Sequence, residues 1–208
     1  MIPGSFAYDR PTSVKEAVGL LAQWGDEGRA LAGGHSLIPM MKLRLATPAH
    51  LVDLGGIAEL KGVRADGSDV VIGAMVTQHE LVASELLGAK VPLLRETSLQ
   101  VADPQVRYVG TIGGNVGNGD PGNDMPAVMM CLGATYHVMG QGGERRIAAR
   151  DFYQGAYFTA LEAGNVPIKI FAACSAQSGV SATLVRPIEQ VATLPPDIVS
   201  TTAAAAVA

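Results

Sequence analysis

Hydrophobic and polar positions follow two periods along most of the chain, and each period predicts a different kind of element. From Val14 to Trp24 the apolar residues recur at helical spacing, so they share one face of a helix. Ser13 and Glu16 have the spacing of a capping box, and Gly25 is a typical residue to end a helix. The pattern therefore predicts an amphipathic helix between these two signals.

Shorter apolar runs between turn residues predict strands and hairpins. Asp66-Gly67 is a hairpin turn signal, and Thr77 and Glu80 have the spacing of a second capping box. Because strands and helices are intermixed, the expected class is α/β or α+β. The expected elements are strands at 29–32, 51–54 and 108–112, hairpins at 62–74 and 135–148, and helices beginning near residues 77, 92 and 126.

The periodic pattern ends near Gly164. Residues 165–208 carry few charges and no clear period. The segment ends in the alanine-rich run 203–208, a low-complexity sequence that is typical of peripheral chain. We therefore expect this alanine-rich end to be disordered or peripheral.

Two glycine-rich turns each follow a predicted strand, at residues 32–36 (AGGHS) and 111–115 (TIGGN). Glycine permits backbone conformations that other residues rarely adopt, and it lets a ligand approach the main chain closely. Successive main-chain N–H groups in such turns can converge on an anion, most often a phosphate. Two such turns far apart in the sequence predict a ligand with two phosphates, held by main-chain N–H groups from two sides.

Each feature also has an ordinary interpretation, and both stay open at this point. A Gly-Gly pair is a common tight exit from a strand, and neither turn has the spacing of a GxGxxG motif or of a P-loop. Asp124, in the polar segment 118–126, either accepts hydrogen bonds from sugar hydroxyls or only caps the following helix. Arg107 either neutralises a phosphate or forms an ordinary salt bridge.

Composition narrows the choice of ligand and compartment. A net charge of -4 with 5% aromatic residues argues against a nucleic-acid surface. The sequence opens without a secretory signal, and no apolar run is long enough to span a bilayer. Its two cysteines, Cys131 and Cys174, are fewer than the four thiolates of a typical iron–sulfur cluster, and a reducing cytoplasm is the expected location.

The residues of these segments resemble a known family. Segments 1–6, 32–39 (AGGHSLIP), 111–115 and 118–124 (NGDPGND) are similar to the FAD-binding medium subunits of molybdenum hydroxylases, most of all to their aerobic carbon monoxide dehydrogenase branch. The resemblance runs from residue 1 to about Glu162. It implies an α+β FAD-binding fold of the vanillyl-alcohol-oxidase (PCMH) type. Its two α/β subdomains would span residues 1–57 and 58–164, with an apparently truncated C-terminal domain. Residues 165–208 would be a divergent or truncated C-terminal tail, in which the family's next strand would begin at 165–170.

The resemblance also implies a cofactor and the residues that bind it. FAD would lie extended between the two subdomains, with its diphosphate at both glycine turns and its ribityl or adenosine part near 120–124. The chain itself would perform no substrate chemistry, so neither a catalytic residue nor a metal ligand is expected. The expected FAD-binding residues are Ala32, Gly33, Gly34, His35, Ser36, Leu37, Thr111, Ile112, Gly113, Gly114, Asn115 and Asp124.

By the same resemblance the chain is an electron-transfer subunit of a heterotrimer, or of a dimer of heterotrimers. A large subunit would carry a molybdenum cofactor and a small subunit the iron–sulfur clusters. Electrons would pass from those clusters through FAD to a quinone or another acceptor, in the cytoplasm or at the inner face of the membrane. Because the chain departs from the family after Glu162, the alternative is a truncated, FAD-free remnant that acts at most as an interaction partner. A self-sufficient flavin oxidase of the same fold is a third alternative.

Overall fold

The computed structural model describes residues 2–162, 164 and 166–173, and the tail at 174–208, with Cys174, lies outside the described residues. The helices are α1 (Val14–Trp24), α2 (Leu37–Lys42), α3 (Gln78–Ala83), α4 (Glu85–Lys90), α5 (Pro92–Gln100), α6 (Pro104–Val109), α7 (Ile112–Asn118), α8 (Asp124–Cys131) and α9 (Ala149–Phe152). The strands are β1 (Ala7–Asp9), β2 (Gly28–Leu31), β3 (His50–Asp53), β4 (Val63–Asp66), β5 (Asp69–Gly73), β6 (Thr135–Gly140), β7 (Gly143–Ala148), β8 (Tyr153–Gly155), β9 (Phe158–Thr159) and β10 (Val166–Ala173).

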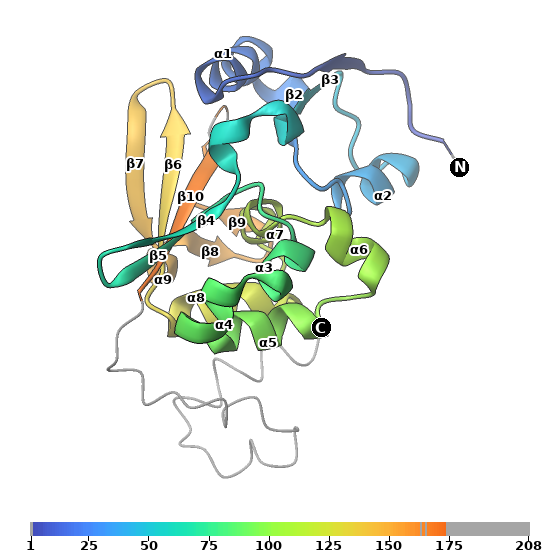
Figure 1. Cartoon of the computed structure of the whole chain (residues 1–208). Helices are drawn as coiled ribbons and strands as arrows, with labels where there is room; N and C mark the ends of the chain where they lie inside the picture. The colour runs from blue at the N-terminus through green and yellow to red at the C-terminus, as the bar shows by residue number, and fades with distance from the viewer. Residues whose placement is uncertain (1, 163, 165, 174–208) are drawn as a thin grey trace.

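The first part of the chain, blue in Figure 1, forms a small parallel sheet packed against α1. The strand order is β1-β3-β2, and β3 is parallel to both neighbours. Parallel strands need a crossover connection, which α1 supplies between β1 and β2. Val14, Val18 and Leu21 of α1 are buried in one cluster with Val52 of β3. This packing fixes β2, whose carboxyl end leads directly into the first glycine turn.

The second sheet has five antiparallel strands in the order β4-β5-β10-β6-β7. β10 is its middle strand, because Ile170 is paired with Ile72 of β5 and with Tyr136 of β6. All three side chains are buried. Residues 166–173, which were expected to belong to the tail, therefore form part of this sheet. The subdomain boundaries expected at 57/58 and 164/165 stay predictions.

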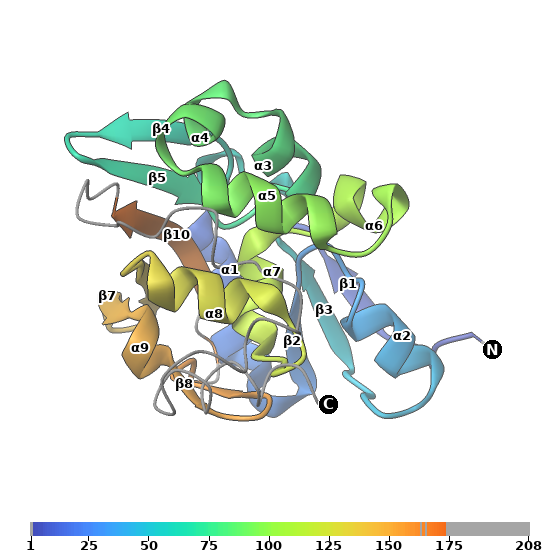
Figure 2. The ribbon, with the colours of Figure 1, turned by 90° about the horizontal axis from the view of Figure 1, so that it is seen from below.

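Helices on one side of the larger sheet complete the main core. Side chains of α3, α4, α5, α7 and α8 pack with those of β5, β6 and β10 in one buried cluster. In both views α7 lies near the centre of the molecule, between β2 and the helices α5 and α8 (Figures 1 and 2). A helix in this position contributes to the core on one side and is available to a ligand site on the other.

An aromatic cluster lies within this core. The ring of Tyr136 meets that of Phe152 edge-on at 4.6 Å between centroids, and the hydroxyl groups of Tyr136 and Tyr153 are 2.8 Å apart. Burial raises the pKa of Tyr136, and it raises the pKa of Tyr153 to about 12. Both phenols are therefore uncharged at neutral pH.

The strongest sequence signals are confirmed. The helix predicted at 14–24 forms as α1, where Ser13 Oγ accepts a hydrogen bond from the Glu16 N–H (3.2 Å). The Glu16 carboxylate accepts from the N–H of Thr12 rather than from that of Ser13 (2.9 Å). The second capping box, Thr77 and Glu80, forms completely. The two predicted hairpins form as β4–β5 and β6–β7.

The strand predicted at 108–112 is wrong. Helix α6 ends at Val109 and α7 begins at Ile112, while Thr111 between them makes one isolated bridge to Thr77. The local signal for α6 is Asp103, whose carboxylate accepts from the N–H of Val106 (2.8 Å), with proline at the first helical position. The second glycine turn is thus the first turn of a helix rather than the exit from a strand.

Candidate functional site

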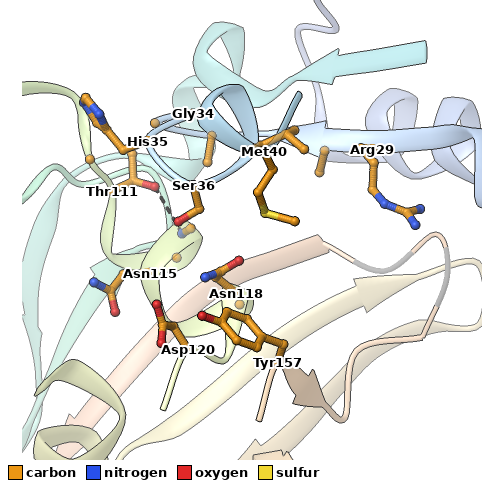
Figure 3. Close-up of a pocket in the computed structure, with 18 of the residues that line it drawn as sticks. Arg29, Gly34, His35, Ser36, Met40, Thr111, Asn115, Asn118, Asp120 and Tyr157 are labelled. Carbon is orange, nitrogen blue, oxygen red and sulfur yellow. Dashed lines mark hydrogen bonds between the residues drawn. The ribbon is translucent and has the colours of Figure 1, made fainter. Parts of the chain in front are cut away.

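A cleft of about 1350 Å³ is lined by both halves of the chain (Figure 3). Its lining comes from the first glycine turn and β2, from the second turn and α7, and from the segment between Tyr157 and Gly164. The volume exceeds the roughly 300–1,000 Å³ of a pocket for a drug-sized molecule. All the expected FAD-binding residues line this cleft except Ile112, whose side chain is fully buried in the core.

The two glycine turns are in direct contact. A Cβ at residue 33 would lie 2.4 Å from the carbonyl oxygen of Val109 and 2.7 Å from Cα of Gly110. A Cβ at residue 114 would lie 3.2 Å from Cβ of Ala32. Only glycine allows main chains to come this close. The turns therefore present one continuous surface to the cleft.

The first turn carries main-chain N–H groups that the fold does not use. Among the described residues, no acceptor is hydrogen-bonded to the N–H groups of Gly33, Gly34, His35 or Ser36. The carbonyl groups of Gly34 and Ser36 accept from α2 instead, at 2.9 and 3.2 Å. Gly34 has φ +75°, a left-handed conformation that favours glycine. The turn thus has main-chain donors available at the cleft, whereas the carbonyl groups of Gly34 and Ser36 are committed to α2.

The second turn differs, because its main-chain N–H groups are already committed. Those of Ile112 and Gly113 donate to the carbonyl oxygens of Val76 and Ala74, at 2.9 and 2.8 Å. The N–H of Gly114 donates to Thr111 Oγ1 at 3.1 Å, a contact dashed in Figure 3, and that of Asn115 donates to the Thr111 carbonyl at 3.0 Å. Main-chain donation to a diphosphate, expected of both turns, is therefore available from the first turn alone within the described part of the chain.

The polar segment after α7 also reaches the cleft. Gly119 ends the helix in a left-handed conformation (φ +63°), and its carbonyl accepts from the N–H of Tyr157 at 2.8 Å. The Tyr157 hydroxyl points toward the carboxylate of Asp120, whose charge raises the pKa of that phenol (Figure 3). Asp124 is exposed at the cleft, but it is not the helix cap expected of it, because α8 has Asn123 at that position.

The charges around the cleft are mostly negative. Among the described lining residues, the carboxylates are Asp26, Asp120, Asp124 and Glu162, and the one guanidinium is that of Arg29. Arg29 Nη1 donates to the carbonyl oxygens of Asp26 and Gly28, at 3.3 and 3.0 Å. An anion in this cleft would thus depend on neutral N–H and O–H donors more than on cations.

Sequence reasoning missed one buried polar side chain that lines the cleft. Gln78 is 1% exposed, and neither its Nε2 nor its Oε1 has a hydrogen-bond partner among the described residues. Asn115 donates from Nδ2 to Asn123 Oδ1 (3.0 Å), but within the described part of the chain its own Oδ1 is buried without a partner. A glutamine at the start of a helix resembles an ordinary exposed residue, so the sequence offers no signal for Gln78.

Other sequence-derived candidates contribute to the fold rather than to the site. Arg107 donates to the carbonyl oxygens of Val101 and Ala102, at 3.1 and 3.0 Å, so it is neither a phosphate ligand nor the expected salt bridge. Cys131 is an exposed free thiol. Within the described residues, no group of three or more His, Cys, Asp or Glu side chains is placed to hold a metal ion. None of the described helices is both long and apolar enough to cross a membrane.

Comparison with known proteins agrees with this geometry. Residues 4–171 match the family described as the FAD binding domain in molybdopterin dehydrogenase. The chain is 65% identical over 166 residues to the carbon monoxide dehydrogenase medium chain of Afipia carboxidovorans, covering 80% of this chain and 58% of that relative. It is 49% identical over 170 residues to the corresponding chain of Hydrogenophaga pseudoflava, covering 82% of this chain and 59% of that one.

A solved structure shows the same fold. The cyanide-inactivated form of the Cu,Mo-CO dehydrogenase contains a chain that superposes with a TM-score of 0.82 at 63% identity. The match covers 83% of this chain and 60% of that one, so the chain spans less than two thirds of the length of these relatives. The expected α+β FAD-binding fold and the resemblance are confirmed. The chain belongs to the family of FAD-binding domains of molybdopterin dehydrogenases.

Proposed function

We propose that this chain binds FAD in the cleft and serves as the flavin-carrying medium subunit of a molybdenum hydroxylase of the carbon monoxide dehydrogenase type. The observation that carries the proposal is the row of N–H groups at Gly33, Gly34, His35 and Ser36, which no described residue accepts from, in the wall of a cleft of about 1350 Å³. Family membership supplies the identity of the cofactor.

The residues of the cleft fit FAD chemically. Diphosphate oxygens only accept hydrogen bonds, and the first turn supplies main-chain donors together with the Ser36 hydroxyl. Ribityl and ribose hydroxyls can donate to carboxylates, which Asp120 and Asp124 supply. The second turn would support the first through the contact of Gly114 with Ala32. In this arrangement the second turn positions the diphosphate site, and the first turn binds the diphosphate.

The chain's part in the reaction would be to hold and orient the flavin. Bound FAD accepts electrons and passes them on, and the protein sets its position and surroundings. The whole sequence has two cysteines, so the iron–sulfur clusters of such an enzyme would lie on a small partner subunit. A large partner subunit would carry the molybdenum cofactor and choose the substrate, and a quinone or another acceptor would take the electrons.

Thermal melting of the purified chain with and without FAD tests the proposal. A ligand at about 100 times its Kd stabilises the native state by about 2.7 kcal/mol. A domain of this size gains about 2–4 °C in Tm per kcal/mol, so we expect a rise of roughly 5–11 °C. Riboflavin, which lacks the diphosphate, is the control and should produce a much smaller shift. An unchanged Tm, with a protein that purifies colourless, would favour the FAD-free remnant instead.

A further inference from the structure

Gln78 is a buried side chain whose hydrogen-bonding groups the fold leaves unused. Its main-chain N–H donates to the carbonyl of Gly110 at 2.9 Å, and Thr77 with Glu80 completes the cap of the helix that it begins. Neither role needs the side chain. The amide nevertheless lies in the cleft wall at 1% exposure with Nε2 and Oε1 both unpartnered among the described residues. Buried unpaired polar groups destabilise a protein, so each one calls for an explanation.

The chemistry of the amide limits what can satisfy it. Nε2 donates and Oε1 accepts, from one planar group. A diphosphate offers acceptors only, so it would leave Oε1 unpaired. A planar ring edge with one donor beside one acceptor satisfies both atoms, as the adenine edge does for glutamine in nucleic-acid recognition. The isoalloxazine ring of a flavin has a comparable edge at N3–H and C4=O.

The position of Gln78 favours a ring over a sugar. Gly110, the main-chain partner of Gln78, donates to the carbonyl of Val106 (2.7 Å), and Val106 and Val101 line the cleft as well. This end of the cleft lies before the first residue of α7, whereas Asp120 follows its last. Seven helical residues separate the two by about 10 Å. Asp120, one of the carboxylates that suit sugar hydroxyls, therefore lies about one length of α7 away from Gly110, and Val101 and Val106 add apolar lining on the side of Gly110.

We propose that Gln78 is a cofactor-binding specificity residue, whose side-chain amide pairs with the donor–acceptor edge of one ring system of FAD. The inference rests on the proposed function, since FAD supplies both candidate rings. None of the described residues pairs with the amide, and in this proposal the cofactor supplies its partner. A preformed site of this kind costs stability in the empty protein and gives selectivity in the loaded one.

The test compares Gln78→Met, which keeps the length of the side chain but loses both polar atoms, with the wild type. Gln105→Met, at an exposed position of α6 outside the cleft lining, is the matched control. Gln78→Glu keeps the shape and the acceptors and loses the donor, so it serves as a second variant. Each protein is titrated with FAD, and the Tm of each is measured without cofactor.

We expect Gln78→Met to weaken FAD binding by about 10-fold or more, which is about 1.4 kcal/mol, and to melt at the wild-type temperature or above when empty. Gln105→Met should bind FAD as the wild type does. If Gln78→Met also binds FAD like the wild type, the inference is wrong while the proposed function stands. A wild-type chain that fails to bind FAD would overturn both the inference and the proposed function, and the wild-type titration shows that result before any variant is made.

The two rings are distinguished with an FAD in which unsubstituted purine replaces adenine, so that the amino donor is missing. If the edge is that of adenine, the wild type binds this analogue about 10-fold more weakly than FAD, and Gln78→Met does not discriminate. If the edge is that of the flavin, Gln78→Met binds FAD and the purine analogue more weakly by the same factor, and the visible absorption band of the bound flavin shifts. Equal weakening without a band shift would assign Gln78 to a sugar and overturn the ring assignment.

Discussion

Substituting Gly33 by alanine tests the contact on which the diphosphate site depends. The added Cβ would lie 2.4 Å from the Val109 carbonyl oxygen, about 1 Å inside the 3.4 Å at which ordinary van der Waals contact begins. Both nearest atoms belong to the main chain, so no side chain can rotate away. That main chain is itself held by the hydrogen bonds from Gln78 to Gly110 and from Gly113 to Ala74. The first turn must therefore move away from residues 109–110, which lead into the second turn.

The size of the effect follows from this geometry. Overpacking of this kind costs about 1–3 kcal/mol, which for a domain of this size lowers Tm by about 2–12 °C. The displaced N–H groups of the first turn would no longer point at the same place in the cleft. We expect the Kd for FAD to rise about 10- to 100-fold, equivalent to about 1.4–2.8 kcal/mol of binding free energy.

Titration with FAD and melting of the empty protein measure the two effects separately. Gly142→Ala adds the same methyl group where no atom lies within 4 Å of the new Cβ, so this control should behave as the wild type. Gly33 does not have a left-handed φ, so an alanine there meets a steric obstacle without backbone strain. A Gly33→Ala protein that melts and binds FAD like Gly142→Ala would refute the close contact of the first turn with Val109 and Gly110.

Three further predictions concern other parts of the chain. Gly19→Ala, at an exposed interior position of α1 with no atom within 4 Å, should stabilise the protein by up to about 1 kcal/mol, and a lower Tm would contradict this. Above pH 10 the unfolded chain loses phenolic protons while buried Tyr136, with its raised pKa, keeps its own, so stability falls as pH rises. Tyr136→Phe should make that fall shallower by about 1.4 kcal/mol per pH unit in urea unfolding between pH 10.5 and 12, and parallel curves would argue against it. Because neutral donors outnumber cations at the cleft, the Kd for FAD should change less than about threefold between about 50 and 500 mM NaCl, and a steep dependence would point to a cationic site.

The sequence predicts most of the local structure because the signals are short-range. Ser13 and Thr77 are helix N-caps, and each is followed three residues later by a glutamate, which predicts the start of a helix. Asp66-Gly67 predicts the turn of the β4–β5 hairpin. The two glycine turns are also visible as motifs, and most of their residues line the cleft. These features depend on neighbours within a few positions, which a single sequence contains.

What the sequence does not reveal depends on contacts between distant segments. Gly113 and Gly114 look like loop residues, but they lie in a helix that packs closely on Ala74 and Ala32. Their N–H groups donate within the fold, which the motif alone cannot show. Gln78 likewise is noticeable only in the folded chain, where its side chain is buried with no hydrogen-bond partner among the residues that the structure describes.

The middle position of β10 has a consequence for how the protein is made. Ile170 is paired with Ile72, about a hundred residues earlier in the chain, and non-local pairings of this kind slow folding. Until the ribosome has released residue 173, β5 and β6 each present a bare edge that can recruit strands from other molecules. The yield of folded protein in a cell therefore depends on how well the edges of β5 and β6 are protected from aggregation until β10 has been synthesised.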